Sequence, residues 1–279
     1  MILIYFLSGL LILSYWYLIL SFIHGWRSLP SFRSDGKADT TVSVIIPFRN
    51  EAGNIEGAVN RIPQMGKHTE ILFVDGNSTD GTVEKIEEMM KRYKGEKDIK
   101  LIHQGGAKGK ADAVRKGFAE ANGDILMILD GDLTVPPEDL PKFYLALAEG
   151  KGEFVNGSRL VYVMEKQAMR SLNILGNKVF SWIFTWLLEQ RIKDTLCGTK
   201  VLFTKDYIKI EKGRDFFGDF DPFGDFDLIF GAAKLNLKIV EMPIRYKARV
   251  YGDIKIRRFK HGWLLLKMSF VALRKLKFY

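Results

Sequence analysis

Short apolar runs alternate with amphipathic stretches along most of the chain. The runs are rich in β-branched residues, and they predict buried strands at 42–48, 70–75, 99–103 and 124–129. Apolar residues at helical spacing predict helices near 51–62, 80–93 and 110–121, with another beginning near Pro137. Continuous apolar strands that alternate with helices are typical of a mostly parallel sheet covered by helices on both faces. We therefore expect an α/β fold.

The first 23 residues form one apolar run without Asp, Glu, Lys, Arg or His, which is long enough to cross a bilayer core as a helix. A cleaved signal peptide is the alternative, but no Lys or Arg precedes the run and no A-x-A-like cleavage site follows it. The residues that follow are basic, namely His24, Arg27, Arg33 and Lys37. Under the positive-inside rule the rest of the chain is cytoplasmic. The sequence thus predicts a single-pass protein of the cell membrane, with an anchor and juxtamembrane part at 1–27 and a linker at 28–40.

Two later stretches are also apolar enough to raise the question of membrane contact. The stretch 166–190 carries Trp182 and Trp186 on one helical face, and its pattern fits either a core helix or a membrane-facing helix. The C-terminal stretch 256–279 mixes Leu, Phe and Trp with Lys and Arg. Because basic amphipathic helices lie on anionic membrane faces, we interpret 256–279 as a membrane-surface segment.

The net charge narrows the choice of partners. The chain has 279 residues, a formal charge of +9 and a pI near 9.4, which suit nucleic acid, an anionic membrane or a polyanionic small substrate. The apolar N-terminus favours the membrane, and the sequence carries no recognition-helix or RNA-binding motif, so nucleic acid is not an expected partner. One cysteine excludes an internal disulfide framework. The oligomeric state stays open.

Polar and charged side chains follow the predicted strands. They are Asn50 and Glu51 after the first strand, Asp75 and Asn77 after the second, Lys110 before the third helix, Asp130 and Asp132 after the fourth strand, and Arg159 after the run that ends in "VNGSR". Each has an ordinary alternative as a turn or capping residue. Parallel strands, however, bring their carboxyl ends to one edge of the sheet, where ligands bind. These side chains are therefore expected to converge.

The pair Asp130 and Asp132 stands at the end of a buried strand, where two carboxylates repel each other. A divalent cation removes that conflict, and Mg²⁺ typically takes one or two carboxylates plus waters and substrate phosphates. The glycine-rich piece before Lys110 does not fit the phosphate-binding loop GxxxxGK[ST], because Gln104 and Ala111 occupy required positions. The pattern therefore favours a metal and diphosphate site that is not a P-loop.

Seven short motifs occur in order between residues 41 and 260. They are "VSVIIPFRNE", "VDGNSTDGT", "KGKADAVRKGF", "LDGDL", "NGSR", "DTLCGTKVLF" and "IVEMPIRYKARVYGDIKI". In this order they resemble the family 2 glycosyltransferases of the GT-A fold, in particular the dolichyl- or polyprenyl-phosphate sugar synthases. The resemblance implies a GT-A catalytic domain at 41–255, an inverting sugar transfer and a nucleotide-sugar donor.

The resemblance also implies roles for individual residues. Base and ribose contacts fall on Pro47, Asn50, Glu51 and Asp75, and phosphate contacts fall on Arg159, Arg249 and Lys255; Asn77 and Lys110 complete the expected nucleotide-sugar site. Asp130 and Asp132 would hold Mg²⁺ or Mn²⁺ and the diphosphate. The lipid-phosphate synthases usually have Gln where this chain has Thr134, which becomes a third expected metal residue. Gly76 and Ile254 also depart from the family pattern.

The acceptor is expected to be a polyprenyl phosphate, which is already an anionic nucleophile and needs no base. A hydroxyl of a glycolipid or polysaccharide is the alternative, and it requires a carboxylate base. The acidic segment after the sixth motif offers Asp219, Asp221, Asp225 and Asp227, of which Asp225 and Asp227 stand just before a helix and could equally be caps. A non-catalytic membrane-tethered binding protein is disfavoured, because the Asp-x-Asp pair is intact.

Overall fold

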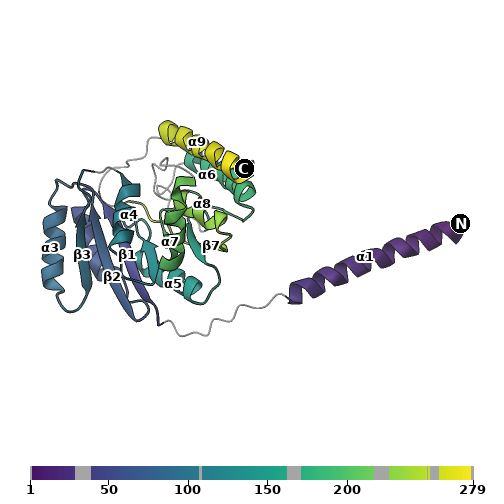
Figure 1. Ribbon diagram of the computed structural model, residues 1–279, viewed down its shortest axis with the longest axis horizontal. Coiled ribbons are helices and arrows are strands. Elements are labelled where there is room, and N and C mark those ends of the chain that lie inside the picture. The colour runs from purple at the N-terminus through teal and green to yellow at the C-terminus, as the bar shows by residue number, and fades with distance from the viewer. Residues whose placement is uncertain are drawn as a thin grey trace. The chain divides into compact units, whose positions relative to one another are not determined.

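The chain divides into two compact units, residues 1–35 and 36–279, in a computed structural model that describes residues 2–28, 39–106, 109–161, 171–216, 226–249, 251 and 258–277. The larger unit is built on a seven-stranded sheet with the order β3-β2-β1-β4-β6-β5-β7 (Figure 1). Its strands are β1 (Thr41–Phe48), β2 (His68–Asp75), β3 (Asp98–His103), β4 (Ile125–Ile128), β5 (Phe154–Ser158), β6 (Lys200–Phe203) and β7 (Ile239–Pro243).

The sheet is parallel except for β6, which runs antiparallel to both β4 and β5. The mostly parallel α/β fold is therefore confirmed, and the four apolar runs form β1 to β4. The sequence did not predict β6. Its apolar part is only Val201–Phe203 and its first residue is Lys200, so the run is too short to indicate a strand by itself.

Helices cover both faces of the sheet, because successive side chains of a strand point to opposite sides. In β1, Ile46 packs into one hydrophobic cluster with Phe73, whereas Ile45 packs into a second cluster with Val74. The first cluster includes α2 (Ala52–Arg61), α3 (Thr82–Arg92) and α5 (Leu140–Ala148). The second includes α4 (Lys110–Ala119), α6 (Ser171–Leu188), α7 (Thr204–Lys212), α8 (Phe226–Lys234) and α9 (Arg258–Lys277).

The helix expected near Pro137 begins with a 3₁₀ turn, Pro137–Asp139, and continues as α5. A second 3₁₀ turn, Arg214–Phe216, lies between α7 and α8. In the sheet, β1 has β2 on one side and β4 on the other, so the chain changes its direction of growth after β3. Open α/β sheets bind ligands at such a switch point, beyond the carboxyl ends of the strands. That point lies between Phe48 and Asp130.

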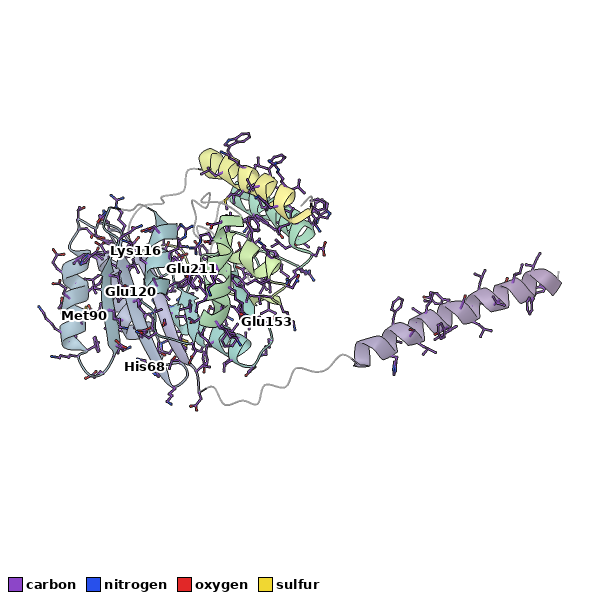
Figure 2. All side chains as sticks on the ribbon, in the orientation of Figure 1. His68, Met90, Lys116, Glu120, Glu153 and Glu211 are labelled. Atoms are coloured by element: carbon purple, nitrogen blue, oxygen red, sulfur yellow. The ribbon has the colours of Figure 1, made fainter. Side chains whose placement is uncertain are left out.

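The N-terminal unit contains α1 (Ile2–Ser28). Its stretch Ile4–His24 is the one helix in the described part of the chain that is long and apolar enough to cross a membrane. None of that stretch is buried, and Figure 2 shows its side chains spreading outward around the helix. The helix predicted at the N-terminus is thus present as a candidate span.

The sequence left open whether α6 is a core helix or a membrane-facing helix, and the structure gives it one buried face and one exposed face. Phe184 and Leu187 are buried in the second cluster, while Trp182 is 85% exposed and Trp186 is 60% exposed. The C-terminal helix α9 packs beside α6 (Figure 1) and buries Leu265 in the same cluster. Both helices therefore have one face in the core and one face outside it.

Candidate active site

A cavity of about 460 Å³ opens at the switch point between β1 and β4. Its size falls within the usual range for small-ligand sites. It is lined by Pro47, Phe48, Arg49, Glu51, Gly76, Asn77, Gln104, Gly109, Lys110, Ala113, Asp130, Gly131, Asp132 and Arg249. The cavity thus brings together seven residues that the sequence predicted for one site, namely Pro47, Glu51, Asn77, Lys110, Asp130, Asp132 and Arg249.

Asp130 forms an ion pair with Lys110 at the cavity surface. The carboxylate Oδ1 lies 2.7 Å from Nζ of Lys110, the first residue of α4. Burial by itself raises the pKa of Asp130, but the nearby charges of Lys110, Lys200 and Arg159 outweigh it, and the net shift lowers the pKa. The nearby positive charges therefore favour the ionised form of Asp130.

The backbone at Gly198 lies close against this ion pair. A Cβ atom at Gly198 would lie 2.5 Å from Nζ of Lys110 and 2.6 Å from Oδ1 of Asp130, so no larger residue fits without moving them. The neighbouring peptide is held by Lys200, whose buried Nζ donates to the carbonyl of Cys197. Gly198 is the glycine of the motif "DTLCGTKVLF", but its residue type alone does not mark it as part of a site.

Asp132 is held from two sides. Its Oδ1 accepts hydrogen bonds from the hydroxyl of Thr134 at 2.8 Å and from the Thr134 amide at 3.2 Å. Its Oδ2 lies 3.5 Å from Nη1 of Arg249, and Nη2 of the same arginine donates to Glu51. Thr134 does not line the cavity; its contact with Asp132 makes it a support for that carboxylate.

The two cavity carboxylates, Asp130 and Asp132, suit a divalent cation that takes its remaining coordinating oxygens from a bound ligand. Among the described residues no group of three or more His, Cys, Asp or Glu could hold a metal alone. Asp130 and Asp132 nevertheless place two carboxylates on one cavity wall, which is the number that Mg²⁺ commonly takes from a protein when phosphates supply other oxygens. The residues therefore fit a shared metal and diphosphate site better than a self-sufficient metal site.

Two of the predicted nucleotide contacts hold loops together and do not line the cavity. Oδ1 of Asp75 accepts from the Ser78 amide at 2.9 Å, and Oδ1 of Asn50 accepts from the Thr79 amide at 2.9 Å. Asn50 has a positive φ of 54°, which asparagine tolerates better than most residues. The loops after β1 and β2 are thus fastened to each other beside the cavity.

The side chain of Gln104 holds a third loop in place. Its position in the sequence indicated only that the P-loop pattern is broken. Its Nε2 donates to the Gly109 carbonyl at 2.8 Å and to Asp112 at 3.0 Å, while its own carbonyl accepts from Lys116 of α4, which is labelled in Figure 2. Asn77 adds a link of 3.0 Å to the Gly105 carbonyl. These bonds hold the start of α4, and with it Lys110, against the strand ends.

Arg159 lies behind the cavity wall in a buried ion pair. Its Nε lies 2.7 Å from Oδ2 of Asp194, its Nη2 lies 2.8 Å from Oδ1, and its guanidinium stacks on Tyr246 at 5.2 Å. Burial raises the pKa of Asp194, but Arg159 more than reverses this, and the pKa falls to about 2. Because Asp194 takes the Nε–Nη2 edge of the guanidinium, Arg159 joins the end of β5 to the segment before β6. The sequence analysis did not single out Asp194.

Asp227, predicted as a base, is buried at the first turn of α8. Its Oδ2 lies 3.2 Å from Nε of Arg214 and 3.6 Å from Nη2 of Arg115, and the side chain does not line the cavity. Asp225 and Lys255, along with Asp219 and Asp221, lie outside the described residues.

The sequence matches the family described as "Glycosyl transferase family 2" over residues 43–209. The dolichol-phosphate mannosyltransferase of Pyrococcus furiosus is 38% identical over 226 residues, which cover 77% of this chain and 59% of the relative. The dolichol-phosphate mannosyltransferase of Saccharomyces cerevisiae is 39% identical over 110 residues, covering 38% of this chain and 40% of the relative. The chain therefore spans less than two thirds of the length of these relatives.

Solved structures share the fold. Glucosyl-3-phosphoglycerate synthase from Mycobacterium tuberculosis, solved with Mn²⁺, uridine diphosphate and glucosyl-3-phosphoglycerate, has a TM-score of 0.62 at 17% identity, covering 87% of this chain and 82% of that one. Mannosyl-3-phosphoglycerate synthase from Rubrobacter xylanophilus has a TM-score of 0.59 at 19% identity, covering 84% and 74%. The predicted GT-A architecture is confirmed by these likenesses, which at such identity concern the fold alone.

Proposed function

Because the chain belongs to glycosyl transferase family 2, we propose that it transfers a sugar from a nucleotide-diphosphate sugar to a polyprenyl phosphate. The observation that carries the proposal is the cavity at the switch point, where Asp130 and Asp132 lie beside Lys110 and Arg249. Two carboxylates and two cations on one wall suit a ligand that combines a divalent cation with a diphosphate. The names of the two mannosyltransferase relatives support the lipid-phosphate acceptor.

In this proposal the charged residues bind and orient the donor. Asp130 and Asp132 would hold Mg²⁺ or Mn²⁺, which would supply positive charge opposite the leaving diphosphate. Lys110 and Arg249 lie within reach of the same wall and offer donors to the diphosphate oxygens. Pro47, Glu51 and Asn77 line the rest of the cavity, where the nucleoside would lie.

The transfer itself is a single displacement. An oxygen of the acceptor phosphate forms a bond to the anomeric carbon, and the bond from that carbon to the diphosphate oxygen breaks. The nucleoside diphosphate leaves with the electron pair, and the configuration at the anomeric carbon inverts. The acceptor phosphate is already an anion at pH 7, so no proton has to be removed, and positioning supplies most of the rate enhancement.

The state of Asp227 bears on one of the two carboxylates, Asp225 and Asp227, that a hydroxyl acceptor could use as a base. A hydroxyl nucleophile needs a carboxylate that is available to take a proton. Asp227 is buried, lies next to Arg214 and Arg115, and stands away from the cavity lining, all of which make it a poor base. Asp225, the other candidate base, lies outside the described residues, so the lipid-phosphate acceptor is proposed on the names of the relatives.

Product analysis tests this proposal. The purified full-length protein, in lipid–detergent micelles with Mn²⁺, is incubated with polyprenyl phosphate and a panel of UDP- and GDP-sugars. We expect one donor to yield a lipid product heavier by a single sugar and linked through the phosphate. Mass spectrometry identifies the product. Transfer to a lipid bearing a hydroxyl but no phosphate, with none to polyprenyl phosphate, would favour the hydroxyl-acceptor alternative.

Membrane attachment is part of the proposed function, because a polyprenyl phosphate is dissolved in the bilayer. We place α1 across the membrane and the catalytic unit on the cytoplasmic side, since basic residues follow the apolar run. The outer faces of α6 and α9 provide a second contact. Trp182, Trp186 and Trp263 are all at least 60% exposed there, and the two helices carry seven basic and no acidic residues. Exposed tryptophans with basic neighbours suit an anionic bilayer surface.

Tryptophan fluorescence can report on this surface alone. The chain has five tryptophans, of which Trp16 and Trp26 are in α1 and the other three are on α6 and α9. In the full-length variant with Trp16→Phe and Trp26→Phe, reconstituted in anionic liposomes, brominated lipids are expected to quench most of the emission. Emission that resists these lipids but is quenched by iodide in the buffer would contradict membrane contact by α6 and α9.

A further inference from the structure

The segment after β7 crosses the carboxyl edge of the sheet and ends beside α2. We call residues 244–249 and 251 the strap. The amide of Ile244 donates to the Ser158 carbonyl at 2.9 Å, and the amide of Lys247 donates to the Thr134 carbonyl at 2.9 Å. The strap is thereby fixed first to β5 and then to the loop that carries Asp132.

The far end of the strap is fixed by a shape fit. The ring of Tyr251 lies against Gly53 in the first turn of α2, and a Cβ atom at Gly53 would be 2.8 Å from Cδ2 and 3.1 Å from Cγ of Tyr251. Gly53 needs no positive φ, so its backbone would accept alanine, and glycine inside a helix costs about 0.5–1 kcal/mol relative to alanine. The close approach of Tyr251 leaves no room for a Cβ at Gly53 unless the ring moves.

Arg249 lies between the two fixed points and reaches into the cavity. Its Nε donates to the Tyr251 carbonyl at 2.7 Å, so the position of Tyr251 determines where the guanidinium can lie. The other two nitrogens face Glu51 and Asp132. Among the described residues, Arg249 is the residue that the strap contributes to the lining of the cavity.

We propose that the contact between Tyr251 and Gly53 is a clasp that positions Arg249 for the donor diphosphate. This inference rests on the proposed function, and it assigns Tyr251 and Gly53 as positioning residues. An arginine side chain has many rotamers, and binding a ligand with a free arginine loses that freedom. The clasp restricts Arg249 before the ligand binds, because it fixes the backbone and the Nε of Arg249. Less conformational entropy of this side chain is therefore lost on binding.

Alanine at Gly53 tests the clasp, and Gly57 of the same helix provides a matched control. A Cβ at Gly57 would meet only Cδ1 of Leu133 at 3.5 Å, an ordinary contact. Binding of inorganic diphosphate with Mn²⁺ to the full-length protein is measured by calorimetry, which requires neither the acceptor nor the correct base. We expect Gly53→Ala to weaken binding about ten-fold, while Gly57→Ala stays within about two-fold. Melting temperatures should not fall for either variant, because alanine favours the helix.

A double-mutant cycle separates the clasp from a general disturbance of α2. With Tyr251→Ala in place the clash is gone, so adding Gly53→Ala should change diphosphate binding no further. The clasp is wrong if the Gly53→Ala variant binds diphosphate as tightly as the unaltered chain. It is also wrong if Gly53→Ala weakens diphosphate binding equally in the presence and in the absence of the Tyr251 ring. If the unaltered chain binds no diphosphate with Mn²⁺, the proposed function fails first and the clasp fails with it.

Discussion

Replacing Asp132 with asparagine is expected to lower sugar transfer by about 10³-fold or more, because charge that stabilises the leaving diphosphate through a metal is lost. The substitution is conservative for the fold. Oδ1 of Asp132 accepts from Thr134, and the amide oxygen of asparagine can accept the same bonds. Turnover is measured with the donor and acceptor identified by the product panel, and Mn²⁺ binding is measured separately in the presence of the nucleoside diphosphate.

Asp98 gives the matched control for this substitution. It begins β3 at the amino edge of the sheet, where its carboxylate lies 3.0 Å from Nε2 of His68 on the surface. Asp98→Asn removes the same charge and should leave turnover unchanged, since exposed pairs contribute little to stability. Should Asp132→Asn retain substantial Mn²⁺-dependent turnover, the carboxylate would not belong to the metal and diphosphate site.

Alanine at Gly198 is expected to lower transfer by about 10²-fold, since a displacement of roughly 1 Å in a catalytic group is enough for such a loss. The added methyl group would lie 2.5 Å from Nζ of Lys110 and 2.6 Å from Oδ1 of Asp130, so the ion pair has to move. The expected signature is weaker binding of metal and nucleoside diphosphate with a folded protein, observed by calorimetry and by circular dichroism.

Gly213 at the end of α7 is the control for the added methyl group. Its Cβ would lie 3.5 Å from the Lys209 carbonyl, which is an ordinary contact, and the residue is away from the cavity lining. Gly213→Ala should therefore keep full activity. Equal losses in the two variants would show that the effect of Gly198→Ala comes from general destabilisation and not from displacement of Asp130.

The part of the fold that the sequence predicted is the part with strong periodicity. The run 42–48 is rich in β-branched residues and the run 125–129 is wholly apolar, because β1 and β4 are buried on both faces. The strand β6 has no comparable pattern. It is four residues long and begins with the buried Lys200, and its place between β4 and β5 depends on contacts far apart in sequence, which a local pattern does not contain.

The site residues also divide into those that the local sequence predicts and those that depend on contacts between distant segments. Asp130, Asp132 and Lys110 come directly after a strand or at a helix start, so topology alone predicts that they meet. Gly198 and Gln104 contribute through backbone proximity or through a bond to another loop, and residue type gives no sign of either. Arg159 shows the opposite case. Its charge suggested a phosphate ligand, and sequence alone gave no sign that Asp194, 35 residues further along the chain, binds its Nε and Nη2.

The order of the strands also governs when the cavity can exist as the chain is made. β6 lies between β4 and β5 in space but follows both in sequence, and Arg249 follows β6 by more than forty residues. A chain growing on the ribosome therefore exposes Asp130 and Asp132 long before Gly198 and the strap emerge to fix them. Until then the two carboxylates stand at the edge of an unfinished sheet. A chain that stops before β6 therefore carries Asp130 and Asp132 without Gly198 or Arg249 beside them.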